Sequence, residues 1–240
     1  IDESQIQEAC SFIRTRGPDK TSSLRWVSDD AKYGSATHFL LDVSGVSSQQ
    51  PLQIFDSFGI PEFTLLFNGE VYNYKDLSCD AGCDTEAIGI LLAAERKLPF
   101  SRLDGEYAIV IWNHKNNCIT VATDQFMTKP VSVGWNSDFS FFGVASYPSA
   151  LSSLGADQIA YATPNAAQVF NLCQPESWTL PGEQPTSQLS TVVYSVVQSS
   201  STYDDWVQGF LSAVRKRALH GTLPIFVPLS SGYDSGAICL

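Results

Sequence analysis

The stretch FTLLFNGEVYNY at residues 63–74 is the most informative part of the sequence. Its first five residues are apolar or β-branched, which is typical of a short buried strand. The dipeptide Asn68-Gly69 that follows is, taken alone, the usual signal of a tight hairpin turn between two strands. The dipeptide alone does not distinguish a turn from a functional site, so the surrounding sequence has to be considered.

Short strand-like segments recur on both sides of residues 63–67. They are rich in β-branched or aromatic residues and separated by Gly, Asn, Asp and Pro, and they occupy residues 39–41, 107–112, 118–122, 131–135 and 139–144. Apolar residues at helical spacing predict a first helix over residues 3–14 and a second over residues 84–97, with Asp84 as its N-cap. This order of elements predicts a mostly antiparallel α+β domain.

Composition and charge exclude several classes of protein. The 240 residues are 44% hydrophobic, which is typical of a globular chain, and the net charge of -11 disfavours nucleic acid or an anionic membrane surface as a partner. No apolar run approaches the roughly 20 residues of a membrane span. The six cysteines are too few and too scattered for a disulfide scaffold, so we expect a cytoplasmic protein.

The sequence changes character after residue 180. Residues 181–201 are rich in Pro, Ser, Thr and Gln, which predicts a linker between a domain at 1–180 and a second unit at 202–240. In that second unit Thr202 and Asp205 have the spacing of a capping box that opens a helix. The apolar residues 223–229 predict a strand that leads into the loop SSGYDS at 230–235 and then a further helix.

This loop has the residue types that hold phosphates. Small residues let backbone N–H groups converge on an anion, the hydroxyls of Ser230 and Ser235 add donors, and a helix N-terminus adds partial positive charge. The loop contains no lysine, so it is not the loop of P-loop NTPases. It is similar to the SGGxDS loop of the ATP pyrophosphatases, with Ser231 in place of a glycine. A plain Ser/Gly turn after a buried strand is the alternative.

Several motifs form an ordered set together with NGEVYN at residues 68–73. They are RGPD at 16–19, GCD at 82–84, LDGEYA at 103–108, TD at 123–124, TKP at 128–130 and AS at 145–146. The set resembles the glutaminase domain of the asparagine synthetase family, whose members are class II glutamine amidotransferases. This resemblance implies an N-terminal nucleophile hydrolase-type αββα sandwich, followed by the beginning of an α/β adenine nucleotide α-hydrolase-like domain.

The resemblance also implies the roles of individual residues in a glutaminase site. Asn68 and Gly69 would be the catalytic donors to the tetrahedral oxyanion. Glu70 and Asp84 would bind the α-ammonium group of glutamine. The expected substrate-binding residues are Leu40, Leu41, Asn68, Gly69, Glu70 and Asp84.

Two features depart from the family pattern. The family nucleophile is an N-terminal cysteine whose own amino group is the base, and it is not among these residues, because only 15 of them precede Arg16 and Cys10 is internal. The arginine that clamps the carboxylate of glutamine is replaced by Thr37 or His38, depending on the gap chosen. Loss of a guanidinium weakens carboxylate binding, so the domain would bind another ligand or be a retained scaffold.

For the second unit the resemblance implies a site for ATP and Mg²⁺. Leu229 would contact the adenine, the loop after it would hold the phosphates, and Asp234 would bind the metal. The expected ATP-binding residues are Leu229, Ser230, Ser231, Gly232, Asp234 and Ser235.

The function that these motifs predict is asparagine synthetase-like ATP-dependent amide formation. A carboxylate substrate would be adenylated and then attacked by ammonia from glutamine. We expect neither nucleic acid nor a membrane as a partner. A homodimer is compatible with the sequence. One alternative is an enzyme like the β-lactam synthetases or lasso-peptide cyclases, with a non-functional glutaminase domain and an internal amine as nucleophile. Another is a non-catalytic homologue that binds a nucleotide or a partner.

Overall fold

The computed structural model describes residues 3–11, 13–27, 33–42, 48–180, 191–192, 202–219, 224–230 and 232–239. Its contacts divide the chain into two units. The larger contains residues 1–41 and 48–195, and the smaller contains residues 42–47 and 196–240. The boundary between residues 195 and 196 falls inside the segment that the sequence predicts as a linker.

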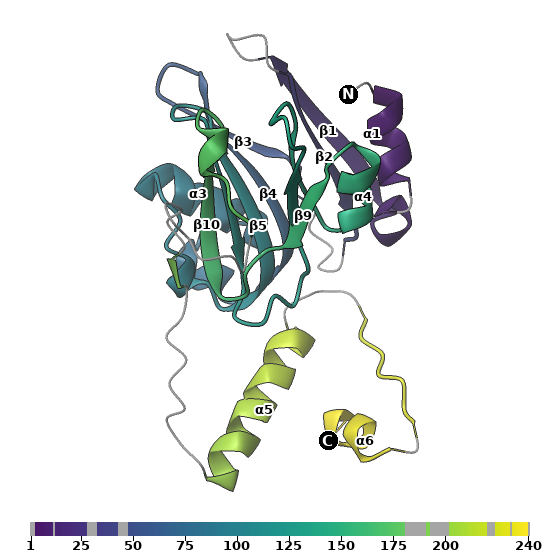
Figure 1. The fold of residues 1–240 in the computed structure, drawn as a ribbon. Helices are drawn as coiled ribbons and strands as arrows, with labels where there is room; N and C mark the ends of the chain where they lie inside the picture. Colours follow the sequence, from purple (N-terminus) through teal and green to yellow (C-terminus); the bar gives the residue numbers. More distant parts are fainter. Residues whose placement is uncertain are drawn as a thin grey trace. The chain divides into compact units, whose positions relative to one another are not determined.

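The larger unit is built around a six-stranded sheet in which all neighbours are antiparallel (Figure 1). In spatial order its strands are β11 (Thr191–Val192), β10 (Ala166–Asn171), β6 (Cys118–Thr123), β5 (Gly105–Asn113), β4 (Pro61–Val71) and β3 (Leu52–Phe55). The strands predicted over residues 63–67, 107–112 and 118–122 are therefore confirmed. Asn68-Gly69 lies inside β4, so the hairpin-turn alternative is wrong.

Two smaller sheets form a second layer. The first pairs β1 (Lys20–Val27) with β2 (Tyr33–Leu40), and the second places β7 (Ser132–Trp135) between β8 (Phe142–Ala145) and β9 (Gln158–Tyr161). Trp26 of β1 lies 4.4 Å from Trp112 of β5, measured between ring centroids. Trp135 of β7 packs with Phe170 of β10 in a shared core. Both smaller sheets thus pack against the six-stranded sheet.

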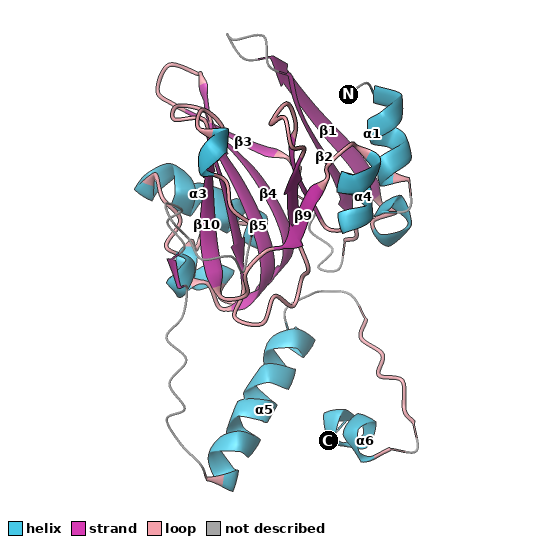
Figure 2. Ribbon diagram, in the orientation of Figure 1, coloured by secondary structure: helices cyan, strands magenta, loops and turns pink. Residues whose placement is uncertain are grey.

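Helices cover the outer faces of the two layers (Figure 2). On one side α3 (Asp84–Glu95) contacts β3 and β4, preceded by the short α2 (Tyr74–Leu77). On the other side α4 (Pro148–Ser153) contacts β7, β8 and β9, and α1 (Glu3–Cys10) contacts α4. The expected α+β class and the order helix, sheet, sheet, helix are confirmed for this unit. Short 3-10 helices lie at Ile13–Arg16, Phe100–Arg102 and Pro175–Ser177.

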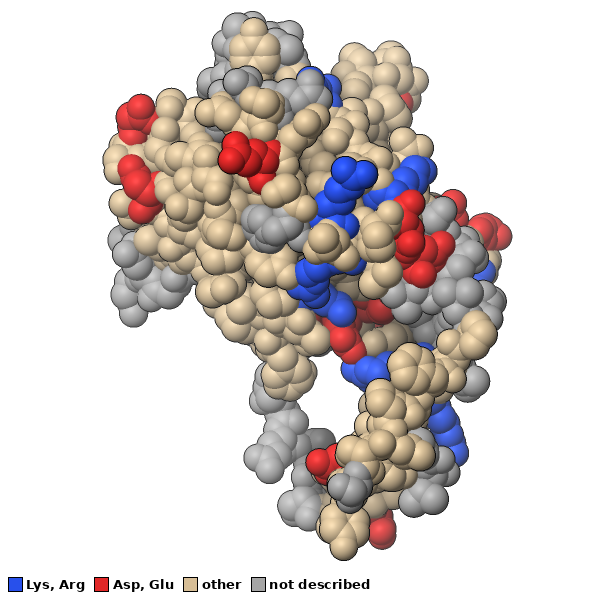
Figure 3. Space-filling view, turned by 90° about the vertical axis from the view of Figure 1, so that its right-hand side faces the viewer, with Lys and Arg blue, Asp and Glu red and all other residues tan. Residues whose placement is uncertain are grey.

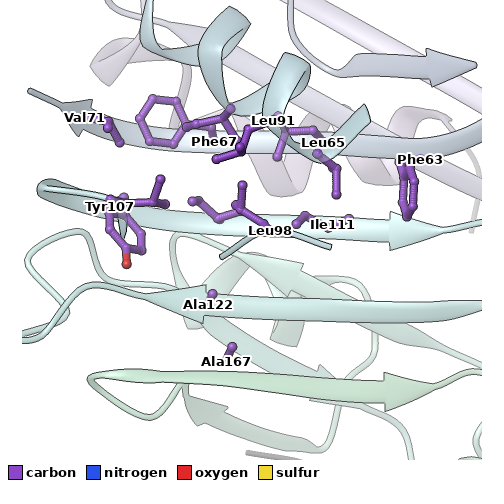
Figure 4. Packing of buried hydrophobic residues seen from close by; sticks show 14 of the residues in the cluster. Phe63, Leu65, Phe67, Val71, Leu91, Leu98, Tyr107, Ile111, Ala122 and Ala167 are labelled. Carbon is purple, nitrogen blue, oxygen red and sulfur yellow. The ribbon is translucent and has the colours of Figure 1, made fainter. Parts of the chain in front are cut away.

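The main core lies between the six-stranded sheet and α3 (Figure 4). Leu65 and Phe67 of β4 pack in it with Ile88 of α3. Because successive side chains of a strand point to opposite faces, Asn68 and Glu70 lie on the other face of β4, toward the second layer. Because the odd-numbered apolar residues of β4 face the core, the side chains of Asn68 and Glu70 point away from it.

Several predicted boundaries are wrong for local reasons. The first helix ends at Cys10, before the 3-10 helix, and α3 ends at Glu95 because Arg96 takes a left-handed φ of 56°. The N-cap of α3 is Cys83, whereas Asp84 is already its first helical residue. Strand β8 begins at Phe142 because Phe139 takes a φ of 59° in the preceding turn.

The smaller unit contains α5 (Tyr203–Leu219) and α6 (Tyr233–Cys239). Asp205 donates its backbone N–H to Thr202 Oγ1 at 3.3 Å, which confirms that Thr202 caps α5. The strand predicted over residues 223–229 is wrong: residues 224–230 pair with no strand that the structure describes. Pro224 and Pro228 have no N–H to donate to a neighbouring strand.

Charged side chains of both signs share the surface. On the face shown in Figure 3, Lys and Arg lie beside Asp and Glu. Within the described ranges, no helix combines the length and the apolar character needed to cross a membrane.

Candidate functional site

The candidate site lies at the carboxyl end of β4. Asn68 pairs with Ala108 of β5, and Gly69 pairs with Tyr107. Gly69 has a φ of +147°, and a Cβ at this position would lie 1.9 Å from the carbonyl oxygen of Glu106, so the backbone requires glycine here. The Asn68 side chain is exposed, and it has no hydrogen-bond partner among the residues that the structure describes. Its amide can therefore donate to a ligand.

Asp84 is brought to the same end of β4 by α3. Its Oδ2 accepts a hydrogen bond from the backbone N–H of Val71 at 3.1 Å, and its Oδ1 accepts one from the N–H of Thr85 at 2.7 Å. A carboxylate in the first turn of a helix is also favoured by the helix dipole. Asp84 is thus fixed to Val71, the residue that directly follows Glu70 in β4.

Glu70 faces a second carboxylate across the sheet. It lies directly opposite Glu106 of β5, and the side chains of directly opposite residues share one face. Glu106 Oε1 accepts a hydrogen bond from the Tyr72 hydroxyl at 2.8 Å, and Glu106 Oε2 lies 3.8 Å from Lys129 Nζ. The sequence motifs contain both Glu106 and Lys129, but the pattern alone assigns a role to neither.

The loop that carries Lys129 is held by Asp124. This buried carboxylate accepts hydrogen bonds from the backbone N–H groups of Tyr107 at 2.9 Å, Phe126 at 2.9 Å and Thr128 at 3.0 Å. It also accepts one from the Thr128 hydroxyl at 3.0 Å. A buried charge with this many donors is well compensated. Because Tyr107 belongs to β5, Asp124 fixes the loop beside the start of that strand.

The structure distinguishes the two residues at the place of the carboxylate clamp. Thr37 Oγ1 lies 3.0 Å from Ser23 Oγ, across the β1–β2 pair. His38 follows Thr37 on β2 and forms a hydrogen bond with the backbone of Phe67, next to Asn68. Burial lowers the pKa of His38 below its usual 6.5, and the bond to Phe67 opposes this shift. His38 therefore lies nearer the site than Thr37, and it is mainly neutral at pH 7.

Leu40 and Leu41 lie at the end of β2. Leu40 is the last residue of the strand, and its carbonyl oxygen accepts the backbone N–H of Asp19 at 3.0 Å. Leu41 follows it with an exposed side chain. A Cβ on Gly17 would lie 2.2 Å from the carbonyl oxygen of Phe39, so the RGPD segment packs closely on this end of β2. Both leucines thus lie beside the RGPD segment.

The serine-rich loop of the smaller unit is closed by its own hydroxyl groups. Ser230 Oγ lies 3.0 Å from Ser235 Oγ, and Gly232 donates its N–H to Ser230 Oγ at 3.2 Å. Ser230 donates its own N–H to Ser235 Oγ at 3.1 Å. The structure therefore brings three of the expected phosphate-binding residues together. Ser231 lies outside the described residues.

The other two residues expected at the nucleotide site flank this loop. Leu229 precedes it and is 70% exposed, and Asp234 lies in the first turn of α6. In the part of the chain that the structure describes, His, Cys, Asp and Glu side chains form no group that could hold a metal ion by itself. ATP and Mg²⁺ therefore stay predictions for this unit.

Comparisons with known proteins point to one family. Residues 1–180 match the glutamine amidotransferase domain family. The chain is 28% identical over 246 aligned residues to the glutamine-hydrolysing asparagine synthetase 3 of Arabidopsis thaliana, covering 98% of this chain and 39% of that protein. It is 27% identical over 138 residues to asparagine synthetase 1 of Bacillus subtilis, covering 54% of this chain and 21% of that protein. The chain thus spans about two-fifths or less of the length of these relatives.

A solved structure shares the fold. The glutamine phosphoribosylpyrophosphate amidotransferase of B. subtilis, determined with ADP and GMP, has a TM-score of 0.58 at 18% identity and covers 80% of this chain and 47% of its own. This likeness concerns the fold alone, and it agrees with the two sheet layers between helices. With the family match over residues 1–180, it leads to one conclusion: the chain belongs to the glutamine amidotransferase domain family.

Proposed function

We propose that the larger unit binds glutamine and releases ammonia from its side-chain amide, for amide formation in an asparagine synthetase-like protein. One observation carries this proposal. Asn68 and Gly69 lie among the last four residues of β4, and Asp84 is fixed by a hydrogen bond to Val71, the last residue of the same strand. Donors for an oxyanion and carboxylates for an ammonium group thus come from one small region.

The residues of this region fit the chemistry of amide hydrolysis. Attack on the amide carbon places negative charge on its oxygen, and the Asn68 amide and the Gly69 backbone N–H would donate to that oxygen. Removing one such donor costs about 2.7–4 kcal/mol of transition-state stabilisation in other enzymes. Glu70 and Asp84 would bind the α-ammonium group. The resemblance to the family implies an N-terminal cysteine as the nucleophile.

We infer a second step, carboxylate adenylation, for the smaller unit. The hydroxyl and N–H donors of Ser230, Gly232 and Ser235 suit phosphate oxygens, and Asp234 supplies a carboxylate of the kind that Mg²⁺ binds together with phosphates. ATP would supply the adenylyl group that activates the carboxylate. The similarity to an asparagine synthetase over 98% of this chain, which includes the smaller unit, supports this proposal.

The test uses the full-length protein. Ammonia release from glutamine is measured alone, and pyrophosphate release is measured with aspartate, ATP and Mg²⁺, with and without glutamine. We expect ammonia release that depends on Asn68 and pyrophosphate release that depends on Asp234. Absence of glutamine turnover by this protein would overturn the proposed glutaminase.

One observation favours a second candidate, an enzyme like the β-lactam synthetases or lasso-peptide cyclases. Neither Thr37 nor His38, at the place of the carboxylate clamp, carries a full positive charge at pH 7. In that case the smaller unit would activate a carboxylate while an internal amine, rather than ammonia, attacks it. Pyrophosphate release that needs neither glutamine nor ammonia would favour this candidate.

A further inference from the structure

We propose that Lys129, acting through Glu106, is a positioning residue for Glu70, and that the pair determines how well the site binds the ammonium group of an amino-acid ligand. This inference rests on the proposed function of the site. It concerns two residues whose motifs the sequence shows but whose contact only the structure shows.

The first step is the repulsion between two carboxylates. Glu70 and Glu106 are directly opposite on β4 and β5, so their side chains leave the sheet on the same face. Like charges in this position destabilise each other. The Glu106 side chain is only 18% exposed, so water screens its charge poorly.

The second step is the compensation of Glu106. The Lys129 ammonium group lies 3.8 Å from Glu106 Oε2, and the Tyr72 hydroxyl donates to Oε1 at 2.8 Å. The loop of Lys129 is fixed to β5 by Asp124, so the cation is placed by the fold and not by a loose surface chain. Glu106 thus contacts a cation and a hydroxyl donor that come from two separate segments.

The third step is the effect on a ligand. With Lys129 present, Glu70 lies opposite a compensated carboxylate and can keep its position. Without Lys129, the repulsion is relieved when Glu70 turns away from Glu106. The ammonium group of the ligand then loses a partner. Because this group is remote from the reacting amide, the loss affects KM rather than kcat.

The experiment measures kcat and KM for glutamine hydrolysis by the full-length protein. We expect Lys129→Met to raise KM about 5-fold to 10-fold while kcat stays within about twofold. The double variant Lys129→Met with Glu106→Gln should return KM to within about twofold of the wild type, because the like charge is gone. Lys129→Arg should resemble the wild type.

Lys115→Met is the matched control. It removes one lysine charge from the turn between β5 and β6, at the other end of β5, and should leave KM unchanged. A Lys129→Met variant that behaves like Lys115→Met would overturn the inference. A double variant no better than Lys129→Met would also overturn it, because loss of packing alone would not be rescued by Glu106→Gln.

The wild-type measurement separates this inference from the function on which it rests. Wild-type protein that neither binds nor hydrolyses glutamine would overturn the proposed function and the inference together. Active wild-type protein with unresponsive variants would overturn the inference alone.

Discussion

The carboxylate of Asp84 accepts a hydrogen bond from the backbone N–H of Val71 at 3.1 Å and thereby joins the first turn of α3 to the end of β4. The contact combines two tasks, since it satisfies a backbone donor and fixes a negative charge at the residue that follows Glu70 in β4. The two tasks can be separated by substitution.

Asp84→Asn keeps an oxygen that can accept from Val71 but removes the negative charge. We expect KM for glutamine to rise at least tenfold and the free energy of unfolding to fall by about 1–3 kcal/mol, because the N–H of Thr85 loses its acceptor. Glu86→Gln, in the same first turn, is the matched control and should leave KM unchanged. Equal effects of the two variants on KM would contradict the role of Asp84.

Asn68→Ala removes the proposed side-chain donor to the oxyanion. We expect kcat for glutamine hydrolysis to fall about 10²-fold to 10³-fold, with a much smaller change in KM. Because the side chain is exposed, the unfolding temperature should stay close to that of the wild type. A variant with normal kcat would show that the oxyanion is held elsewhere.

Gly69→Ala should destabilise the protein by about 3 kcal/mol, because it combines a disfavoured backbone conformation with a clash against the Glu106 carbonyl. Gly59→Ala is a matched control in the same unit: Gly59 also has a positive φ, 78°, but a Cβ there meets no atom within 4 Å. We expect this control to cost only about 1 kcal/mol. Urea unfolding of both variants checks the difference, and equal losses would show that the clash is relieved.

The lowered pKa of His38 makes stability depend on pH. The folded state binds the proton more weakly than the unfolded state, so the stability that the neutral ring contributes is present above pH 6.5 and is lost as the pH falls from 6.5 through the lowered pKa. Burial also lowers the pKa of His114. We expect the free energy of unfolding to fall between pH 7.5 and 5.5, and to fall less in His38→Gln and in His114→Gln. Unchanged slopes would contradict these shifts.

The central strands of the fold could be predicted from sequence because their apolar runs face a core. β10 could not, since its first residues, Ala166 and Ala167, have little intrinsic strand preference and its place beside β6 comes from pairing with a distant segment. The same limit applies to β1, whose polar residues form a strand only because β2 lies against them. Both segments form strands because they pair with strands from other parts of the chain.

The candidate site divides in the same way. Asn68, Gly69, Glu70 and Asp84 could be placed because each lies in a local motif. The choice between Thr37 and His38 needed the alternation of β2, which turns one toward Ser23 and the other toward Phe67. Glu106 and Lys129 belong to separate motifs, and a local sequence pattern does not predict that residues of two motifs are in contact.

The four hydrogen bonds that the Asp124 carboxylate accepts have a consequence for ligand binding. They set the loop of residues 124–130 in place when the protein folds, so this side of the site is preorganised. The entropy needed to order the loop is lost during folding and does not oppose association with a ligand. A ligand that binds beside β4 therefore contacts a loop that is already ordered, and its affinity depends on how well it fits that loop.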